Sequence, residues 1–145
     1  MLNLNPEEIK KMVEEKYGKV AQEPCGLFNF PVGKAFALKV GYPKEILDNL
    51  PQSLTESFTG ANNPQPFVEL RKGEIVLDLG CCAGLDLYFY AKNAGGEGKV
   101  YGLDISGEMV RKARENMQKM DIKNVEVMIG HSDNLPFGES FFDMV

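Results

Sequence analysis

Ile75-Val76-Leu77-Asp78-Leu79-Gly80-Cys81-Cys82-Ala83-Gly84 is the stretch that decides the fold of this chain. Its apolar half, residues 75–79, predicts a buried strand. A turn between two glycines follows, and then a helix over about residues 85–94. A second apolar segment, residues 100–103, ends in Asp104 at the distance of one βαβ unit. The pattern predicts two adjacent parallel strands whose carboxyl ends meet at the glycine turn, around a pocket of nucleotide size.

The charge of the residues at this turn distinguishes between two classes of nucleotide cofactor. The pyrophosphate of a dinucleotide binds at the helix N-terminus after the glycine turn, where Asp78 would repel it. S-adenosylmethionine has no phosphate, and Asp78 attracts its ammonium and sulfonium groups, directly or through a water. Asp104 is suited to ribose hydroxyls, and Gly80 lets the backbone approach the ligand because it has no Cβ. The sequence therefore favours S-adenosylmethionine as the cofactor.

Length and composition are those of a globular domain with an ordinary core. The chain has 145 residues, of which 43% are hydrophobic and 26% charged, which is typical of soluble domains. Its net charge of −5 leaves no basic surface for phosphates, so we expect no nucleic-acid partner. No apolar run approaches membrane-spanning length, and the three cysteines do not make a disulfide framework. We therefore expect a cytoplasmic protein with reduced thiols, no membrane partner and no bound metal.

The N-terminal part of the chain, residues 1–69, is expected to form a helical segment and a linker. Asn5 caps the first helix, and a proline and two acidic residues follow in its first turn. Apolar residues recur along this helix at helical spacing, so one of its faces is expected to be buried. Gly18 is expected to end the helix, and a second, short helix is expected over about residues 44–50.

The remaining residues, 70–145, are expected to form an α/β core, because strands alternate with helices. Ser106 caps a predicted helix that ends near Met120 and buries a stripe of apolar residues. Residues 125–129 predict a third strand and residues 141–145 a fourth. The expected fold is therefore α/β, a Rossmann-like parallel sheet with an N-terminal helical segment.

Four motifs of this core resemble those of class I S-adenosylmethionine-dependent methyltransferases, in the family's order and approximate spacing. The motifs are Val-Leu-Asp-Leu-Gly (76–80), Gly-Leu-Asp-Ile-Ser (102–106), Asp-Asn-Leu-Pro-Phe (133–137) and Phe-Asp-Met-Val (142–145). The resemblance implies methyl transfer from S-adenosylmethionine to a small-molecule acceptor, and a strand order of 3-2-1-4. A complete family member continues past the fourth strand, so the resemblance also implies a core that is truncated at its C-terminal end.

The N-terminal part resembles the arsenite methyltransferase branch of this family. The shared features are a helix with Tyr17-Gly18, a helix start at Gly41-Tyr42, and a loop at residues 60–64. By this resemblance Tyr17 closes over the cofactor, although it could equally serve to pack its helix. The family's loop cysteine, which helps to bind arsenic, is replaced by Ala61, while Cys25 matches a cysteine of the N-terminal segment. An arsenite-like acceptor is implied, but the missing thiol speaks against arsenite itself, because trivalent arsenic needs clustered thiolates.

Two positions of the expected cofactor site depart from the family pattern. Cys82 stands where the turn has glycine, and its side chain is expected to crowd the methionine part of the cofactor. His131 stands where the family has an acid that reaches adenine. It is either a general base or, more commonly for a lone loop histidine, a solvated side chain. The predicted cofactor-binding residues are Asp78, Gly80, Cys81, Cys82, Gly84, Asp104, Ile105, His131 and Ser132.

Alternative functions stay open at the level of the sequence. The chain is either the cofactor half of a methyltransferase or a non-catalytic cofactor-binding or interaction module left by truncation. A nicotinamide-dependent oxidoreductase is disfavoured by Asp78 and by the absence of a Gly-x-Gly-x-x-Gly pattern. No catalytic residue is identified. Residues 141–145 lack the lysines, prolines or bulges that discourage edge pairing, so a homodimer through this edge is expected, with a frayed C-terminus as the alternative.

Overall fold

Three parallel strands form the sheet at the centre of the computed structural model, which describes residues 5–145. The strands are β1 (Ile75–Leu79), β2 (Lys99–Asp104) and β3 (Val125–Ile129), and β2 lies in the middle. Leu79 pairs with Leu103, and Asp104 pairs with Ile129. Because all three strands run in the same direction, their carboxyl ends meet at one edge of the sheet. The predicted α/β class with a parallel sheet is confirmed.

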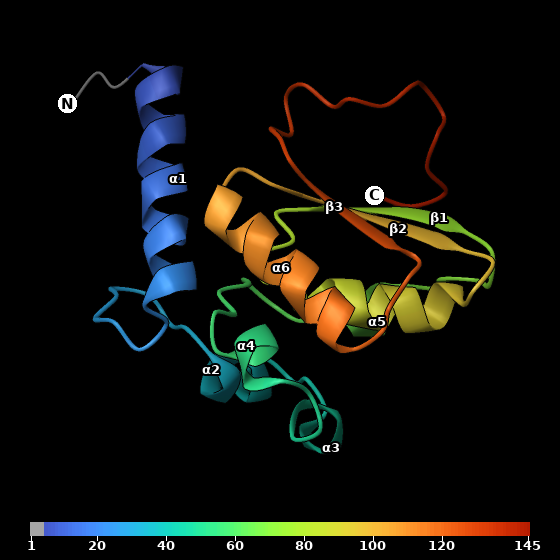
Figure 1. Ribbon diagram of the computed structural model, residues 1–145, viewed down its shortest axis with the longest axis horizontal. Coiled ribbons are helices and arrows are strands. Elements are labelled where there is room, and N and C mark those ends of the chain that lie inside the picture. Colours follow the sequence, from blue (N-terminus) through green and yellow to red (C-terminus); the bar gives the residue numbers. More distant parts are fainter. Residues whose placement is uncertain (1–4) are drawn as a thin grey trace.

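Two helices complete the βαβ units. They are α5 (Leu85–Ala94) and α6 (Gly107–Lys119), which lie on the same face of the sheet (Figure 1). The Ser106 side chain caps α6 by accepting a hydrogen bond from the Met109 backbone N–H, as the sequence predicts. The segment after β3 runs over the opposite face. There Phe137, Phe141 and Phe142 gather around Tyr101 of β2, with ring centroids 5.3–5.7 Å from the tyrosine ring.

The first helix, α1 (Pro6–Gln22), begins where the sequence predicts and ends later than predicted. Asn5 and Glu8 form a reciprocal capping box at its start, with both hydrogen bonds at 2.9 Å. The prediction that Gly18 ends this helix is wrong. Gly18 is a buried contact point against α6, where a Cβ would come within 3.2 Å of the Glu108 carboxylate. The glycine is thus explained by close helix packing rather than by a helix end.

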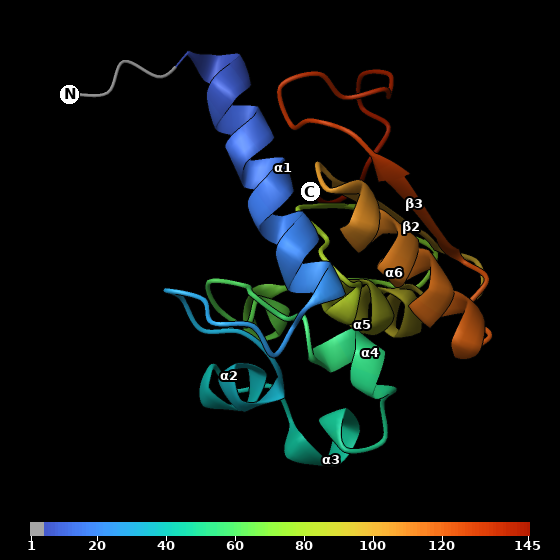
Figure 2. The same ribbon diagram turned by 60° about the vertical axis from the view of Figure 1, so that its left-hand side comes forward.

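Short helical segments connect α1 to the sheet (Figure 2). The predicted helix over residues 44–50 is shorter, because the chain turns ahead of Pro51, whose ring disfavours helical conformation in the preceding residue. Sequence reasoning missed the two short helices on either side of it, of six and four residues. The segments are α2 (Lys34–Lys39), α3 (Lys44–Leu47), α4 (Gln52–Thr55) and η1 (Gln65–Phe67).

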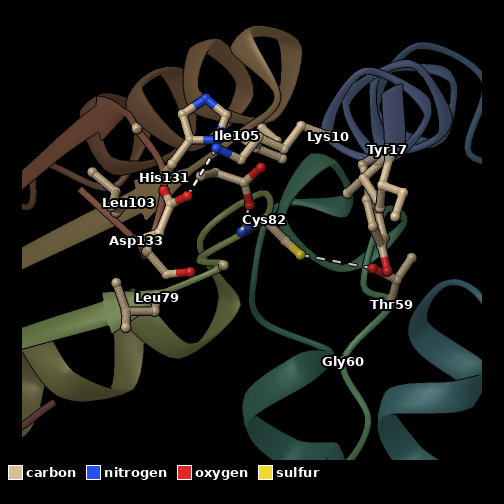
Figure 3. Close-up of a pocket in the computed structure, with 16 residues that line it drawn as sticks. Lys10, Tyr17, Thr59, Gly60, Leu79, Cys82, Leu103, Ile105, His131 and Asp133 are labelled. Atoms are coloured by element: carbon tan, nitrogen blue, oxygen red, sulfur yellow. Dashed lines mark hydrogen bonds and ion pairs between the residues drawn. The ribbon is translucent and has the colours of Figure 1, made fainter. Parts of the chain in front are cut away.

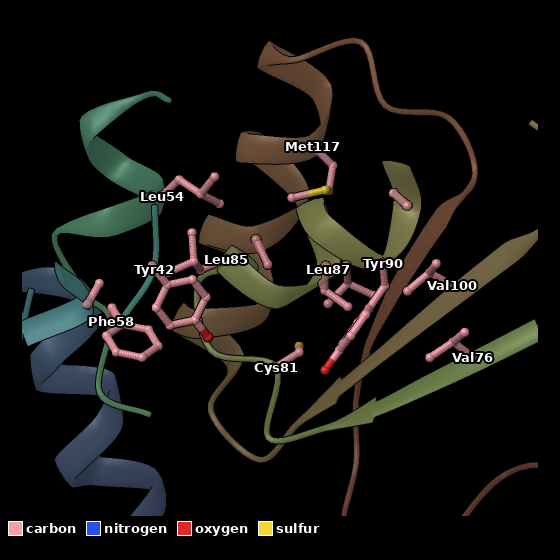
Figure 4. Packing of buried hydrophobic residues seen from close by; sticks show 14 of the residues in the cluster. Tyr42, Leu54, Phe58, Val76, Cys81, Leu85, Leu87, Tyr90, Val100 and Met117 are labelled. Carbon is pink, nitrogen blue, oxygen red and sulfur yellow. The ribbon is translucent and has the colours of Figure 1, made fainter. Parts of the chain in front are cut away.

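The N-terminal segment and the α/β part share one hydrophobic core (Figure 4). Tyr42, Leu54 and Phe58 from the N-terminal segment pack in the same cluster as Leu85 and Leu87 of α5. Leu54 and Leu87 are fully buried. The N-terminal segment is therefore held against the helix that follows the glycine turn, which brings its loops to the edge of the sheet where the strands end.

The predicted fourth strand, residues 141–145, does not form. Met144 alone makes a parallel bridge to Val76 of β1. The Asp143 side chain accepts a hydrogen bond from the Ile75 backbone N–H at 2.7 Å, so a carboxylate takes the place of a backbone carbonyl in the ladder. The segment still lies beside β1, on the side away from β2, as the order 3-2-1-4 predicts. Within residues 5–145, no helix combines the length and apolarity needed to cross a membrane.

Candidate functional site

A cavity of about 530 Å³ lies at the carboxyl ends of the strands, between the sheet and α1 (Figure 3). The predicted site residues Gly80, Cys82, Asp104, Ile105, His131 and Ser132 line it. The other lining residues are Ile9, Lys10, Val13, Tyr17, Thr59, Gly60, Leu79, Leu103, Gly130 and Asp133. Its walls therefore come from the glycine turn, the loop after β3, α1 and the loop before β1.

The glycine turn folds back onto β2 and exposes backbone to the cavity. The N–H groups of Gly80 and Cys81 both donate to the Leu103 carbonyl, at 2.7 and 3.1 Å. Gly80 has φ +78° and no heavy atom within 4 Å of its missing Cβ, so its role is conformational. Gly84 has φ +96°, and a Cβ there would also press on Met117 of α6 at 3.0 Å. Gly84 is buried and precedes the first residue of α5. It therefore allows the turn to pack against α6 and does not line the cavity.

Cys82 has a backbone conformation that glycine would adopt with less strain. Its φ is +50°, in the left-handed region that costs a residue with a Cβ about 1–2 kcal/mol. Its Sγ lies on the cavity wall, 3.7 Å from the Thr59 hydroxyl. Burial, and then the nearby Asp104 carboxylate, raise the Cys82 pKa to about 12. The thiol is therefore protonated at neutral pH and is a steric and polar feature, not a nucleophile.

Asp104 links the turn to the helix that follows β2. One of its carboxylate oxygens accepts the Cys82 N–H at 2.8 Å, and the other accepts the Ser106 N–H at 2.9 Å. The residue is 5% exposed, and burial raises its pKa, although these hydrogen bonds oppose the shift. Each oxygen retains lone-pair capacity toward the cavity, because an ionised carboxylate accepts at about four positions. The two backbone donors thus fix the position of the carboxylate on the cavity wall.

Asp78 and Cys81 do not line the main cavity. Cys81 is buried beneath the turn, and burial raises its pKa well above the usual thiol value. Burial raises the pKa of the half-buried Asp78 to about 7, and the carboxylates of Asp86 and Asp104 add to the shift. The three acids around the turn therefore repel one another. A cationic group bound beside them would relieve that repulsion.

Sequence reasoning missed Asp86 and the residues that hold it. Its Oδ1 atom accepts hydrogen bonds from the Tyr42 hydroxyl at 2.7 Å and from the Gln65 amide at 2.8 Å. Burial raises the pKa of Asp86, while these two donors oppose the shift. The position of Asp86, in the first turn of the helix after the glycine turn, was the only sequence signal that could have identified it. Tyr42 and Gln65, which donate to it, lie far away in sequence and were not predictable.

The wall formed by α1 was also not predicted, except for Tyr17. Ile9, Val13 and Tyr17 follow at intervals of one helical turn and face the cavity. Ile9 is 48% exposed, so the first part of the apolar stripe expected to be buried lines an open site, whereas Val20 at its other end is buried as predicted. Lys10 reaches across the mouth of the cavity to Asp133 in the loop after β3, with an N–O distance of 2.8 Å (Figure 3).

The chemistry of these walls fits S-adenosylmethionine. Asp104 offers acceptors for ribose hydroxyls, and Leu79, Leu103 and Ile105 offer apolar surface for a base. The acids at the turn suit the cationic groups of the cofactor. Across residues 5–145, no group of three or more His, Cys, Asp or Glu side chains is arranged to hold a metal ion.

Comparisons with known proteins agree with this geometry. The family model described as a methyltransferase domain matches residues 70–145. An arsenite methyltransferase of Halobacterium salinarum is 32% identical over 97% of this chain and 39% of its own length. A demethylmenaquinone methyltransferase of Listeria welshimeri is 39% identical over 54% of this chain and 33% of its own length. The crystal structure of a SAM-dependent methyltransferase from Aquifex aeolicus superimposes with a TM-score of 0.51 at 27% identity, over 98% of this chain and 57% of that one.

The fold and the site define the class of S-adenosylmethionine-dependent methyltransferases. The chain belongs to the methyltransferase domain family. The predicted resemblance to this class and to the arsenite methyltransferases is confirmed by these matches. The chain spans 39% of the arsenite methyltransferase and 33% of the demethylmenaquinone methyltransferase.

Proposed function

We propose that the chain is the cofactor-binding part of a methyltransferase that transfers a methyl group from S-adenosylmethionine to a small-molecule acceptor. The main observation behind this proposal is the position of Asp104. Its carboxylate is fixed by backbone N–H groups on the wall of a cavity at the carboxyl ends of the strands. When bound, the cofactor supplies a methyl group that its sulfonium already activates. The protein therefore contributes mainly position and a dry site.

Each wall of the cavity has a role in this proposal. Asp104 accepts hydrogen bonds from the ribose, and Gly80 lets the cofactor approach the backbone. Asp78 and Asp86 lie behind the cavity wall at the glycine turn, and a bound cationic methionine end would favour their ionised forms and lower their raised pKa values. Tyr17 and its neighbours on α1 exclude water. His131 and Ser132 lie where they can contact the base, and no catalytic base is assigned.

The relatives named above support two kinds of acceptor. The arsenite methyltransferase matches nearly the whole chain and supports an arsenite-like acceptor. The demethylmenaquinone methyltransferases match the α/β part and support an organic acceptor. All three cysteines are free thiols, which is consistent with a cytoplasmic location. The exposed side chain of Val145, next to the Met144 bridge to β1, supports a homodimer through this edge of the sheet.

Titration with S-adenosylhomocysteine tests the proposed cofactor site. The Asp104→Ala variant should bind more weakly by about 1–3 kcal/mol, because the hydroxyl groups lose a fixed acceptor. Asp121→Asn is the matched control, since Asp121 lies after α6 with a side chain 83% exposed. Melting curves of both variants show whether the fold is retained. Unchanged affinity in folded Asp104→Ala would remove Asp104 from the site, and no binding to the unsubstituted chain would overturn the proposal.

A further inference from the structure

A second cavity of about 380 Å³ adjoins the cofactor cavity. Tyr17, Thr59 and Gly60 line both cavities, so the two spaces are direct neighbours. The second cavity is otherwise lined by Lys16, Asn29, Phe30, Pro31, Phe36 and Ala61. We propose that it is the methyl-acceptor site, and that its residues select a small aromatic molecule with an anionic substituent. This inference rests on the proposed function.

The position of the second cavity suits an acceptor. A methyl group is transferred directly between reacting atoms that are in near contact, so the acceptor must bind in a space that opens onto the cofactor. Thr59 borders both spaces, and its hydroxyl lies 3.7 Å from the Cys82 sulfur on the cofactor side. A volume of about 380 Å³ lies within the range of about 300–1,000 Å³ typical of small-ligand sites.

The walls of the second cavity are rich in aromatic rings. Phe30 lies between Phe28 and Tyr17, with ring centroids 5.4 and 6.3 Å away. Phe36, which also lines this cavity, packs against Phe58, with ring centroids 5.8 Å apart. Phe30 and Phe36 are both half-buried, so each presents ring surface to the cavity. Aromatic walls of this kind favour a flat ring that makes offset or edge contacts.

A positive charge stands at the rim of this cavity. The Lys16 ammonium lies over the Phe30 ring, 4.4 Å from its centroid. None of the ion pairs found within residues 5–145 involves Lys16. The ring holds the side chain at the rim, and its charge is available for a carboxylate or a similar anion.

Thiolates for a soft metalloid are not provided at this cavity. Ala61 lines it and carries no thiol, while Cys25 is exposed and lines neither cavity. The Cys82 thiol faces the cofactor cavity instead. The side chains that surround the acceptor space therefore match an aromatic anion better than an arsenic species bound by sulfur.

The test uses the full chain saturated with S-adenosylhomocysteine and follows backbone amide NMR shifts during titration with 4-hydroxybenzoate. We expect the amides of Phe30 and Ala61 to shift. Lys16→Gln should weaken the affinity about fivefold, the size of one partly exposed ionic contact. Ala61→Phe should abolish binding by filling the cavity. Lys19→Gln, an exposed lysine on the same helix that lines neither cavity, should bind as the unsubstituted chain does.

The outcomes separate this inference from the proposed function. If S-adenosylhomocysteine binds but 4-hydroxybenzoate does not, or binds Ala61→Phe equally well, the acceptor site is overturned and the cofactor site stands. A response of the Phe30 and Ala61 amides to sodium arsenite in place of 4-hydroxybenzoate also overturns it. If S-adenosylhomocysteine itself fails to bind, the proposed function is overturned, and the acceptor assignment falls with it.

Discussion

Lys112 of α6 is the side chain whose removal should most directly loosen the N-terminal segment from the α/β part. Its ammonium donates to the Glu56 carboxylate at 2.6 Å, to the Ser57 hydroxyl at 2.7 Å and to the Ala21 carbonyl at 3.0 Å. These acceptors lie at the end of α1 and just before Thr59. Lys112 thus ties both N-terminal walls of the cavity to the helix that follows Asp104.

Lys112→Met keeps most of the apolar stem and removes the charge. Breaking a buried ion pair by removing one partner costs about 3–5 kcal/mol, because the other charge is left without compensation. The Lys112 side chain is 11% exposed, but that of Glu56 is 24% exposed, so water can partly hydrate the carboxylate. We therefore expect a loss near the lower limit, about 3 kcal/mol in the free energy of unfolding. That is a large part of the about 5–15 kcal/mol typical of a domain.

Urea unfolding followed by circular dichroism gives the free energy of unfolding by linear extrapolation. Arg111→Met is the matched control, since its exposed pair with Glu115 should contribute less than about 1 kcal/mol. Adding Glu56→Gln to Lys112→Met should recover part of the loss, because no charge is then left unpaired. A loss below about 1 kcal/mol for Lys112→Met, or an equal loss in Arg111→Met, would refute this reasoning.

Further outcomes follow from the site. Cys82→Gly should bind S-adenosylhomocysteine more tightly and unfold at higher urea, because it relieves the left-handed φ of +50°; weaker binding would show that the steric argument is wrong. The unfolded chain holds Asp78 near its ordinary pKa of 3.8, and the folded chain raises it to about 7. The folded state therefore binds the extra proton, and stability should fall as pH rises from about 4 to 7; urea unfolding of Asp78→Asn should lack this part of the decline, and an identical pH profile would contradict the assignment. Tyr42→Phe should lower the free energy of unfolding, measured by calorimetry, by about 1–2 kcal/mol, because the hydrogen bond to Asp86 is lost. Tyr88→Phe is the control, since the Tyr88 hydroxyl makes no such bond. Light scattering should show a dimer at high concentration; a monomer with mobile final residues would rule out pairing at the edge beside β1.

Local patterns in the sequence were enough to predict most of the α/β part. The strands at residues 75–79 and 125–129 and the helix at residues 85–94 have the predicted bounds. Ser106 caps α6 as expected. These elements depend on apolar runs, turns and caps within a few residues of one another, so neighbouring side chains carry the information.

Longer-range packing decided the elements that were predicted wrongly. Gly18 resembles a helix end in the sequence, but the close approach of α6 explains it in the structure. Residues 141–145 have the composition of a strand, yet their aromatic rings gather around Tyr101 and Asp143 replaces a backbone partner. In both cases a contact with a distant segment outweighs the local propensity.

The sequence by itself determined the parallel sheet, the glycine turn and the acids at the ends of its first two strands, because strand direction alone places those residues together. Only the tertiary structure decided what faces them. Asp86 is held by Tyr42 and Gln65, which lie 44 and 21 residues away, and α1 supplies a wall of the cavity from the other end of the chain. The shared core of Tyr42, Phe58 and Leu85 brings these segments together. Burial of that core depends on how the whole chain packs, and no local pattern encodes which distant side chains meet there.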